Sequence, residues 1–183
     1  MSDYLEESQQ VYKDADLLCS PQSVEAALDR MAQEISHQLG DKNPLVISIM
    51  TGGLVPGGML LPRLDFPLTI DYIHATRYGN KTSGGLLDWK VRPHQSLQDR
   101  VVLLIDDILD EGLTLEAIVA DCREAGAAEV YTAVLVEKIR DRCTDIKADF
   151  VGLDVEDRYL FGYGMDYKGY LRNAAGIYAV KGA

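Results

Sequence analysis

A run of five apolar residues, Val101 to Ile105, most constrains the fold that this chain can adopt. An uninterrupted run of this kind is typical of a strand that is buried on both faces of a sheet, and we predict a strand over 100–106. A helical pattern follows at 114–127, and a second apolar run follows at 129–138. The segment therefore predicts a strand–helix–strand unit whose two strands are parallel.

The same alternation continues along the rest of the chain. Ser20 and Pro21 favour the start of a helix that ends at Gly40, and a second helix is expected at 54–64. The other predicted segments are strands at 44–50, 68–78, 148–155 and 176–180, and a loop at 79–89. This order predicts a single α/β domain over 1–183 with a mainly parallel sheet, whose ligands bind beyond the C-terminal ends of the strands.

Composition excludes several classes of function. The chain has 183 residues, 47% of them hydrophobic, and a formal net charge of −11, which disfavours nucleic acid as a partner. No apolar run is long enough to predict a membrane span, and the acidic N-terminal segment does not resemble a secretory signal. Three scattered cysteines, Cys19, Cys122 and Cys143, predict neither a disulfide framework nor a zinc site, and they favour a cytoplasmic location.

Four carboxylates follow the 100–106 strand closely: Asp106, Asp107, Asp110 and Glu111. Like charges at this spacing repel one another and raise their pKa values, so we expect a cation or a group rich in hydroxyls beside them. One alternative is an acidic loop that only caps the next helix. A Walker B segment would need a GxxxxGK[ST] loop, which the chain lacks, and a receiver-type acidic pocket would follow the first strand of a shorter chain.

The stretch "LLIDDILDEGLT", 103–114, resembles the ribose-phosphate signature of the type I phosphoribosyltransferases. The resemblance implies a Rossmann-like sheet flanked by helices, with a small hood region formed by the chain termini. Asp106 and Asp107 would accept hydrogen bonds from ribose hydroxyls and help to hold Mg²⁺. Phosphoribosyl pyrophosphate would also contact two turns, made of Thr51, Gly52 and Gly53, and of Asp110, Glu111, Gly112, Leu113 and Thr114.

The second half of the chain resembles the 6-oxopurine branch of that family, the hypoxanthine-guanine enzymes. The resemblance rests on "VLVEK", 134–138, and on "ADFVGLDVEDRYLFGYGMDYKGYLR", 148–172. It implies that Lys138 donates to the purine 6-oxo group, that Tyr159 stacks on the base and that the Leu160 backbone meets its edge. Asp166 would hold a second Mg²⁺, and Arg172 would contact the pyrophosphate. Asp110 is the implied general base, and a flexible lid at about 76–90 would include Arg77 and Tyr78.

The implied reaction is purine salvage: the phosphoribosyl group passes from phosphoribosyl pyrophosphate to N9 of hypoxanthine or guanine, giving IMP or GMP and pyrophosphate. A xanthine-preferring enzyme and an RNA-binding regulator on the same fold are the alternatives. Two residues depart from the family pattern: Thr51 replaces a common lysine, and Glu111 replaces a small hydroxyl residue. The resemblance also implies a homodimer or homotetramer.

Overall fold

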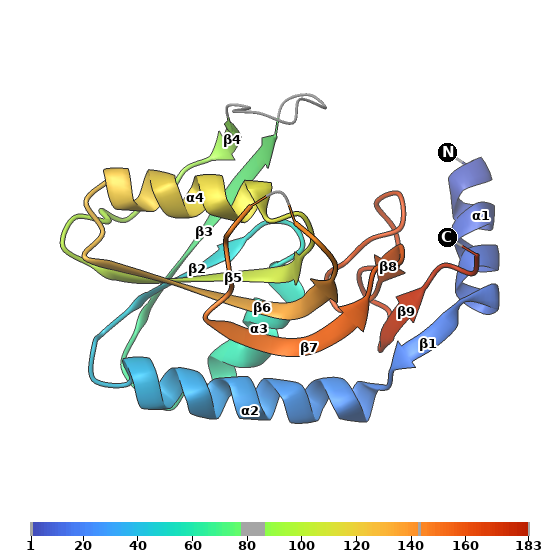
Figure 1. Ribbon diagram of the computed structural model, residues 1–183, viewed down its shortest axis with the longest axis horizontal. Helices are drawn as coiled ribbons and strands as arrows, with labels where there is room; N and C mark the ends of the chain where they lie inside the picture. Colours follow the sequence, from blue (N-terminus) through green and yellow to red (C-terminus); the bar gives the residue numbers. More distant parts are fainter. Residues whose placement is uncertain (1, 78–86, 143, 183) are drawn as a thin grey trace.

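The fold is built around a six-stranded sheet in a computed structural model that describes residues 2–77, 87–142 and 144–182 (Figure 1). Its strand order is β4-β3-β2-β5-β6-β7. Only the β3–β4 pair at one edge is antiparallel, and every other neighbouring pair is parallel. The strands are β2 (Leu45–Ile49), β3 (Thr69–Arg77), β4 (Leu87–Val91), β5 (Val101–Leu109), β6 (Glu129–Ile139) and β7 (Phe150–Glu156). The predicted α/β class with a mainly parallel sheet is confirmed.

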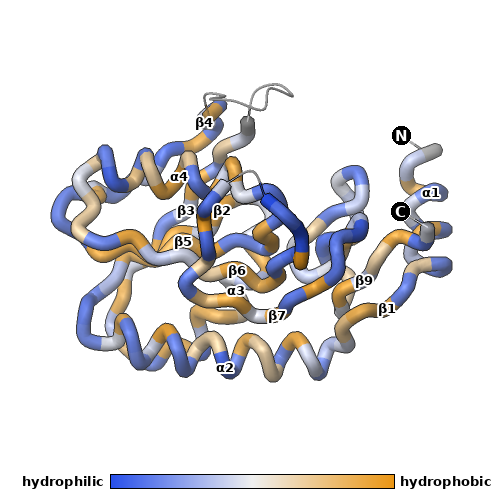
Figure 2. Tube along the Cα trace, viewed as in Figure 1, coloured by the Kyte–Doolittle hydropathy of each residue, from blue (hydrophilic) through white to orange (hydrophobic). Residues whose placement is uncertain are grey.

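Helices cover both faces of this sheet. Helix α2 (Pro21–Leu39) and helix α3 (Leu54–Leu60), which continues into the 3₁₀ turn Leu61–Arg63, lie on one face, and α4 (Leu113–Glu124) lies on the other (Figure 1). Successive residues of a strand point to opposite faces, so Leu103 and Ile105 pack with the α2 side while Val102 and Leu104 pack with the α4 side. Figure 2 shows the hydrophobic central strands beside a helix α2 that alternates in hydropathy.

The α2 prediction is confirmed in detail. Ser20 is the N-cap, and its side-chain oxygen accepts a hydrogen bond from the Ser23 backbone N–H. This bond satisfies one of the N–H groups that a helix start leaves without a partner, and Pro21 needs none. The residues predicted for the apolar face are all buried: Val24, Ala27, Leu28, Met31, Ile35 and Leu39.

A second, smaller sheet joins the two ends of the chain. Strand β1 (Asp16–Cys19) pairs with β9 (Ile177–Ala179), which pairs with β8 (Leu160–Phe161), all antiparallel. Helix α1 (Ser2–Asp14) lies against this sheet, beside the C-terminus (Figure 1). These elements form the hood that the family resemblance implied, although α1, β1 and β8 were not predicted as elements.

Several predicted boundaries differ from the structure, and two of them lie beside the candidate site. Strand β5 continues to Leu109 rather than ending at Asp106, because its pairing with β6 continues through Ile108 and Leu109. The predicted loop at 79–89 overlaps strand β4, which begins at Leu87 and pairs with β3. Among the described residues, no helix is long and apolar enough to cross a membrane.

Candidate active site

The acid pair lies at the centre of the C-terminal edge of the large sheet. Asp106 and Asp107 belong to the last part of β5, not to a turn after it, and Asp106 is in register with Val134 of β6. The Asp107 backbone N–H donates to the Asp106 carboxylate at 2.9 Å. Because β5 is flanked by β2 and β6, both acids are placed where a parallel sheet binds its ligands.

Burial makes this pair of carboxylates unusual. Asp107 is only 7% exposed. Burial raises the pKa of Asp106 well above its usual range, and the negative charge of Asp107 raises it further. The pKa of Asp107 is also raised by burial, while Arg172 acts in the opposite direction. A positive charge placed beside the pair would therefore stabilise both carboxylates.

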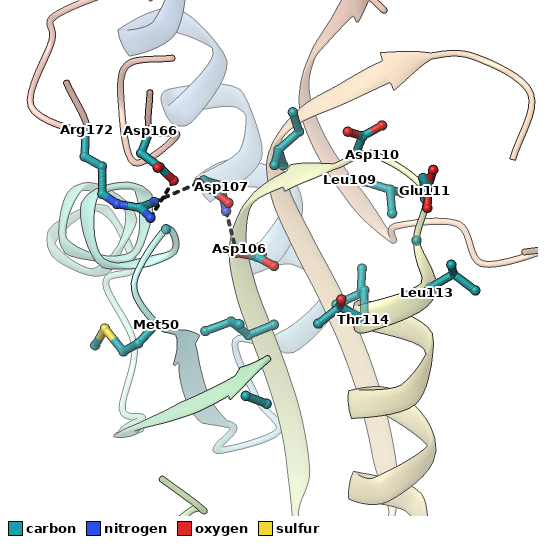
Figure 3. Close-up of a pocket in the computed structure, with 16 residues that line it drawn as sticks. Met50, Asp106, Asp107, Leu109, Asp110, Glu111, Leu113, Thr114, Asp166 and Arg172 are labelled. Atoms are coloured by element: carbon teal, nitrogen blue, oxygen red, sulfur yellow. Dashed lines mark hydrogen bonds and ion pairs between the residues drawn. The ribbon is translucent and has the colours of Figure 1, made fainter. Parts of the chain in front are cut away.

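Arg172, among the described residues, supplies such a charge. Its guanidinium lies between Asp166 and Asp107, with N–O distances of 2.6 Å to Asp166 and 3.8 Å to Asp107 (Figure 3). It also donates to the Gly164 carbonyl. The segment after β8 is thus tied to the end of β5, and Asp166 and Arg172 come together with the acid pair.

The Thr51-Gly52-Gly53 turn packs directly on Asp107. It follows β2 and leads into α3, and the Met50–Thr51 peptide is cis. A Cβ atom at Gly52 would collide with the Asp107 carboxylate, so only glycine fits at this position. Thr51 is exposed, and its backbone carbonyl accepts a hydrogen bond from Leu54.

The turn from Asp110 to Thr114 leads from β5 into α4. Gly112 precedes the helix with φ of +81°, a conformation that glycine adopts without steric cost. A Cβ atom at Gly112 would lie 2.5 Å from Thr144 Oγ1, and the same Thr144 hydroxyl donates to the Glu111 carbonyl at 3.0 Å. The backbone of the turn is therefore held by the segment after β6, and its N–H groups lie at the start of α4, where an anion is favoured.

Asp110 has cationic partners that the sequence analysis missed. Lys138 Nζ lies 2.9 Å from one carboxylate oxygen of Asp110, and Arg140 Nη1 lies 2.7 Å from the other. Asp157 is 3.2 Å from Lys138 and 3.5 Å from Arg140. The Glu111 carboxylate lies 3.9 Å from Arg140 Nη2. This cation partly offsets the negative charge that Glu111 adds where the family commonly has a small hydroxyl residue.

Arg142 joins the same turn to strand β6. Its Nε donates to the Asp110 carbonyl at 2.8 Å, its Nη2 donates to the Lys138 carbonyl at 2.7 Å, and its Nη1 pairs with Glu137 at 2.7 Å. One largely buried guanidinium thus fixes the turn against the strand that carries Lys138. The signal for it was the cluster of basic residues in "EKIRDR", 137–142, which by itself resembles a solvated surface segment.

Two adjoining cavities gather most of the predicted residues. A cavity of about 450 Å³ is lined by predicted phosphoribosyl pyrophosphate contacts, namely Gly52, Asp106, Asp107, Asp110, Glu111, Gly112, Leu113, Thr114 and Arg172 (Figure 3). The predicted metal ligand Asp166 lines it as well. A smaller one of about 190 Å³ is lined by the predicted purine contacts Lys138, Tyr159, Leu160 and Asp166, together with Asp107, Ile108, Asp110 and Met165. Lys138 is 9% exposed, whereas Tyr159 is 45% exposed.

The other predicted site residues either do not line the larger cavity or lie outside the described residues. Thr51 and Gly53 flank Gly52 in the chain, but they do not line the larger cavity. Arg77 is the last residue of β3, and Tyr78 lies outside the described residues, as does most of the predicted lid at 76–90. In the described part of the chain, no three acidic, histidine or cysteine side chains converge into a metal cage. A Mg²⁺ ion held by Asp106 and Asp107 would take its other ligands from substrate and water.

The comparison with known protein families shows which family this chain belongs to. The phosphoribosyl transferase domain family matches residues 17–168 of this chain. The chain belongs to the phosphoribosyl transferase family. In this phosphoribosyl transferase, the β5 acids and the turn that follows them lie within the residues that match the family.

Curated relatives and solved structures place this phosphoribosyl transferase in the 6-oxopurine branch. The hypoxanthine-guanine phosphoribosyltransferase of Bacillus subtilis is 33% identical over 168 residues, which cover 91% of this chain and 93% of that protein. The hypoxanthine-guanine-xanthine enzyme of Tritrichomonas foetus is 31% identical over 86% of each chain. A crystal structure of a Staphylococcus aureus hypoxanthine phosphoribosyltransferase superposes with a TM-score of 0.88 at 26% identity, covering 93% of this chain and 94% of that one.

Proposed function

We propose that this phosphoribosyl transferase joins hypoxanthine or guanine to phosphoribosyl pyrophosphate, giving IMP or GMP and pyrophosphate. The observation that carries the proposal is the position of Lys138, which lies in the smaller cavity 2.9 Å from Asp110 of the turn that borders both cavities. A donor for a 6-oxo group therefore adjoins a site suited to ribose and phosphate. The names of the curated relatives support the same reaction.

The roles of the residues follow from their chemistry. We assign the ribose hydroxyls to Asp106 and Asp107, and the 5-phosphate to the backbone N–H groups between Asp110 and Thr114. Arg172 would contact the pyrophosphate. When bound, Mg²⁺ would neutralise the departing pyrophosphate; Asp106 and Asp107 would hold one ion, and Asp166 would hold a second.

In the reaction, the bond between the anomeric carbon and the pyrophosphate oxygen breaks and a bond from purine N9 to that carbon forms. The purine loses its N7 proton, and we assign Asp110 as the base that accepts it. Because Lys138 and Arg140 occupy both Asp110 oxygens in this structure, one of these contacts must exchange for the purine. The exposed Tyr159 ring would cover one face of the base.

One panel of substrates tests the proposal. Phosphoribosyl pyrophosphate and Mg²⁺ are supplied with hypoxanthine, guanine, xanthine, adenine, uracil or orotate, and nucleotide formation is measured. Turnover of hypoxanthine or guanine is the expected result, and turnover of pyrimidines alone would refute the assignment. Xanthine is the second candidate substrate because the Tritrichomonas foetus relative is named for it.

Removal of divalent metal is expected to weaken the binding of phosphoribosyl pyrophosphate by about tenfold or more. The reason is that its anionic pyrophosphate would otherwise approach the Asp106 and Asp107 carboxylates at the cavity without a bound cation to offset the like charges. Calorimetric titration with Mg²⁺ and with excess chelator measures the difference. Equal affinities in the two titrations would contradict a metal at this site.

Arg142→Lys is expected to lower kcat/KM for hypoxanthine about tenfold, because a lysine cannot reach both carbonyls and Glu137 at once. Arg30→Lys is the matched control, since Arg30 also donates to two backbone carbonyls, Val151 and Gly152, away from the site. Kinetics and the Tm of both variants are compared. An unchanged kcat/KM in Arg142→Lys would remove this residue from the active-site framework.

We expect the protein to form a homodimer or homotetramer, as the family resemblance implies. On β3, Ile70 is 59% exposed and Tyr72 is 42% exposed, and both point to the same side of the strand. Such exposed apolar side chains are available for a contact between copies. Light scattering coupled to size exclusion measures the assembly.

A further inference from the structure

Helix α1 lies outside the part of the chain that matches the family, which begins at residue 17. It nevertheless lies beside the small β1-β9-β8 sheet (Figure 1). Leu160 of that sheet lines the smaller cavity. The Tyr12 ring meets Phe161 edge-on at 5.9 Å and Tyr178 edge-on at 5.1 Å, measured between centroids. The helix is thus docked by aromatic contacts at its C-terminal half, and this fixes where its preceding turn lies.

Glu7 of that preceding turn reaches the segment that follows the purine contacts. Its carboxylate accepts a hydrogen bond from the Tyr167 hydroxyl at 2.8 Å and pairs with Lys168 Nζ at 2.7 Å. Lys168 also lies over the Tyr4 ring, 5.4 Å from its centroid. Two successive residues of the 166–170 turn are therefore bound to α1.

Tyr167 in turn contacts the residue assigned to purine stacking. Its ring meets the Tyr159 ring edge-on, with centroids 5.5 Å apart. Tyr159 lines the smaller cavity and is 45% exposed, so much of its ring faces solvent. A side chain that is free to rotate must be ordered when a ligand stacks on it, and this ordering weakens binding.

Asp166, at the start of the same turn, is anchored independently of α1. Its carboxylate accepts the Gly169 backbone N–H at 2.6 Å and pairs with Arg172 at 2.6 Å. Tyr167 and Tyr170 close the turn with two mutual backbone hydrogen bonds of 2.9 Å. Loss of the Glu7 contact should therefore affect the purine side of the site and leave the pyrophosphate side in place.

We propose that α1 is a positioning element for purine binding: Glu7, through the Tyr167 hydroxyl, holds the Tyr159 ring in the orientation that receives the base. The proposal rests on the proposed function and deepens it. It states that α1, which precedes the residues that match the family model, contributes to the affinity for the purine. Glu7 touches no substrate. Its effect on the base passes through the Tyr167 hydroxyl and ring to Tyr159.

The test is a split between the two substrates. Glu7→Ala is expected to raise KM for hypoxanthine about 3–10-fold, with kcat and the KM for phosphoribosyl pyrophosphate changed less than about twofold. Glu7→Gln keeps an acceptor for the Tyr167 hydroxyl and is expected to restore a KM near that of the wild type. Glu6→Ala is the control, because Glu6 is an exposed acid on the same helix.

Tyr167→Phe isolates the hydroxyl, since it keeps the ring that meets Tyr159. Its effect on KM for hypoxanthine should match that of Glu7→Ala, and the double variant should be no worse than either single variant. Additive effects, a rise in both KM values, or a KM for hypoxanthine unchanged in Glu7→Ala would each overturn the proposal. Absence of turnover in the wild type would instead refute the proposed function, so the two failures are distinguishable.

Discussion

Adenine is expected to be used with a kcat/KM about 10⁴–10⁵-fold below that of hypoxanthine. Lys138 presents only N–H donors: it donates to Asp110 at 2.9 Å, and its Nζ lies 3.2 Å from Asp157. A ligand that meets Lys138 must therefore supply an acceptor. The 6-oxo group of hypoxanthine supplies one, whereas the 6-amino group of adenine would place donor against donor in a site where Lys138 is nearly buried.

Lys138→Gln tests the same assignment from the protein side. A glutamine amide offers an acceptor as well as donors, so the preference against adenine should shrink while the rate with hypoxanthine falls. The measurement is kcat/KM for both bases in both proteins. If the wild type used adenine comparably, or if the variant left hypoxanthine kinetics unchanged, Lys138 would not be the residue that reads the purine.

Asp110→Asn is expected to lower kcat about 10²–10⁴-fold and to weaken phosphoribosyl pyrophosphate binding far less. The amide has the size of the carboxylate and leaves the Asp110 backbone carbonyl free to accept from Arg142. It cannot accept the N7 proton of the purine. Steady-state kinetics, supported by calorimetric binding of phosphoribosyl pyrophosphate, separate the two effects.

Asp157→Asn is the matched control for this variant. Asp157 contacts the same two cations as Asp110, Lys138 and Arg140, at 3.2 Å and 3.5 Å. The control therefore removes a comparable countercharge without removing the proposed base. A similar fall in kcat in both variants would mean that the charge network matters and that Asp110 is not the base.

Much of the fold was predictable because its signals are local. The apolar run of β5, the helical spacing of α4 and the Ser20 cap of α2 each depend on neighbouring residues. The end of β5 was misplaced because charged residues usually end a buried strand. Here the strand keeps its pairing with β6 past Asp106 and Asp107, since the apolar Ile108 and Leu109 follow them.

Other features depend on residues that are far apart in the chain. Strand β1 is only four residues long and exists because it pairs with β9, so that Asp16 lies opposite Ala179. In the sequence, the two arginines after β6, Arg140 and Arg142, resemble surface residues. In the structure, both contact Asp110 because the end of β6 lies against the turn that contains it. The spacing of the motifs could predict the ribose-phosphate turn, but not which cations would surround its acid.

The two cavities share a wall made of Asp107, Ile108, Asp110 and Asp166. A ligand that moves these side chains in one cavity changes the free energy of binding in the other, and a thermodynamic cycle makes that change equal in both directions. If bound phosphoribosyl pyrophosphate changes the affinity for the purine by some factor, bound purine therefore changes the affinity for phosphoribosyl pyrophosphate by the same factor. A nucleotide product spans both cavities, so once one part of it is bound, the other part is held at a high effective concentration beside the second cavity. This favours tight binding of the product.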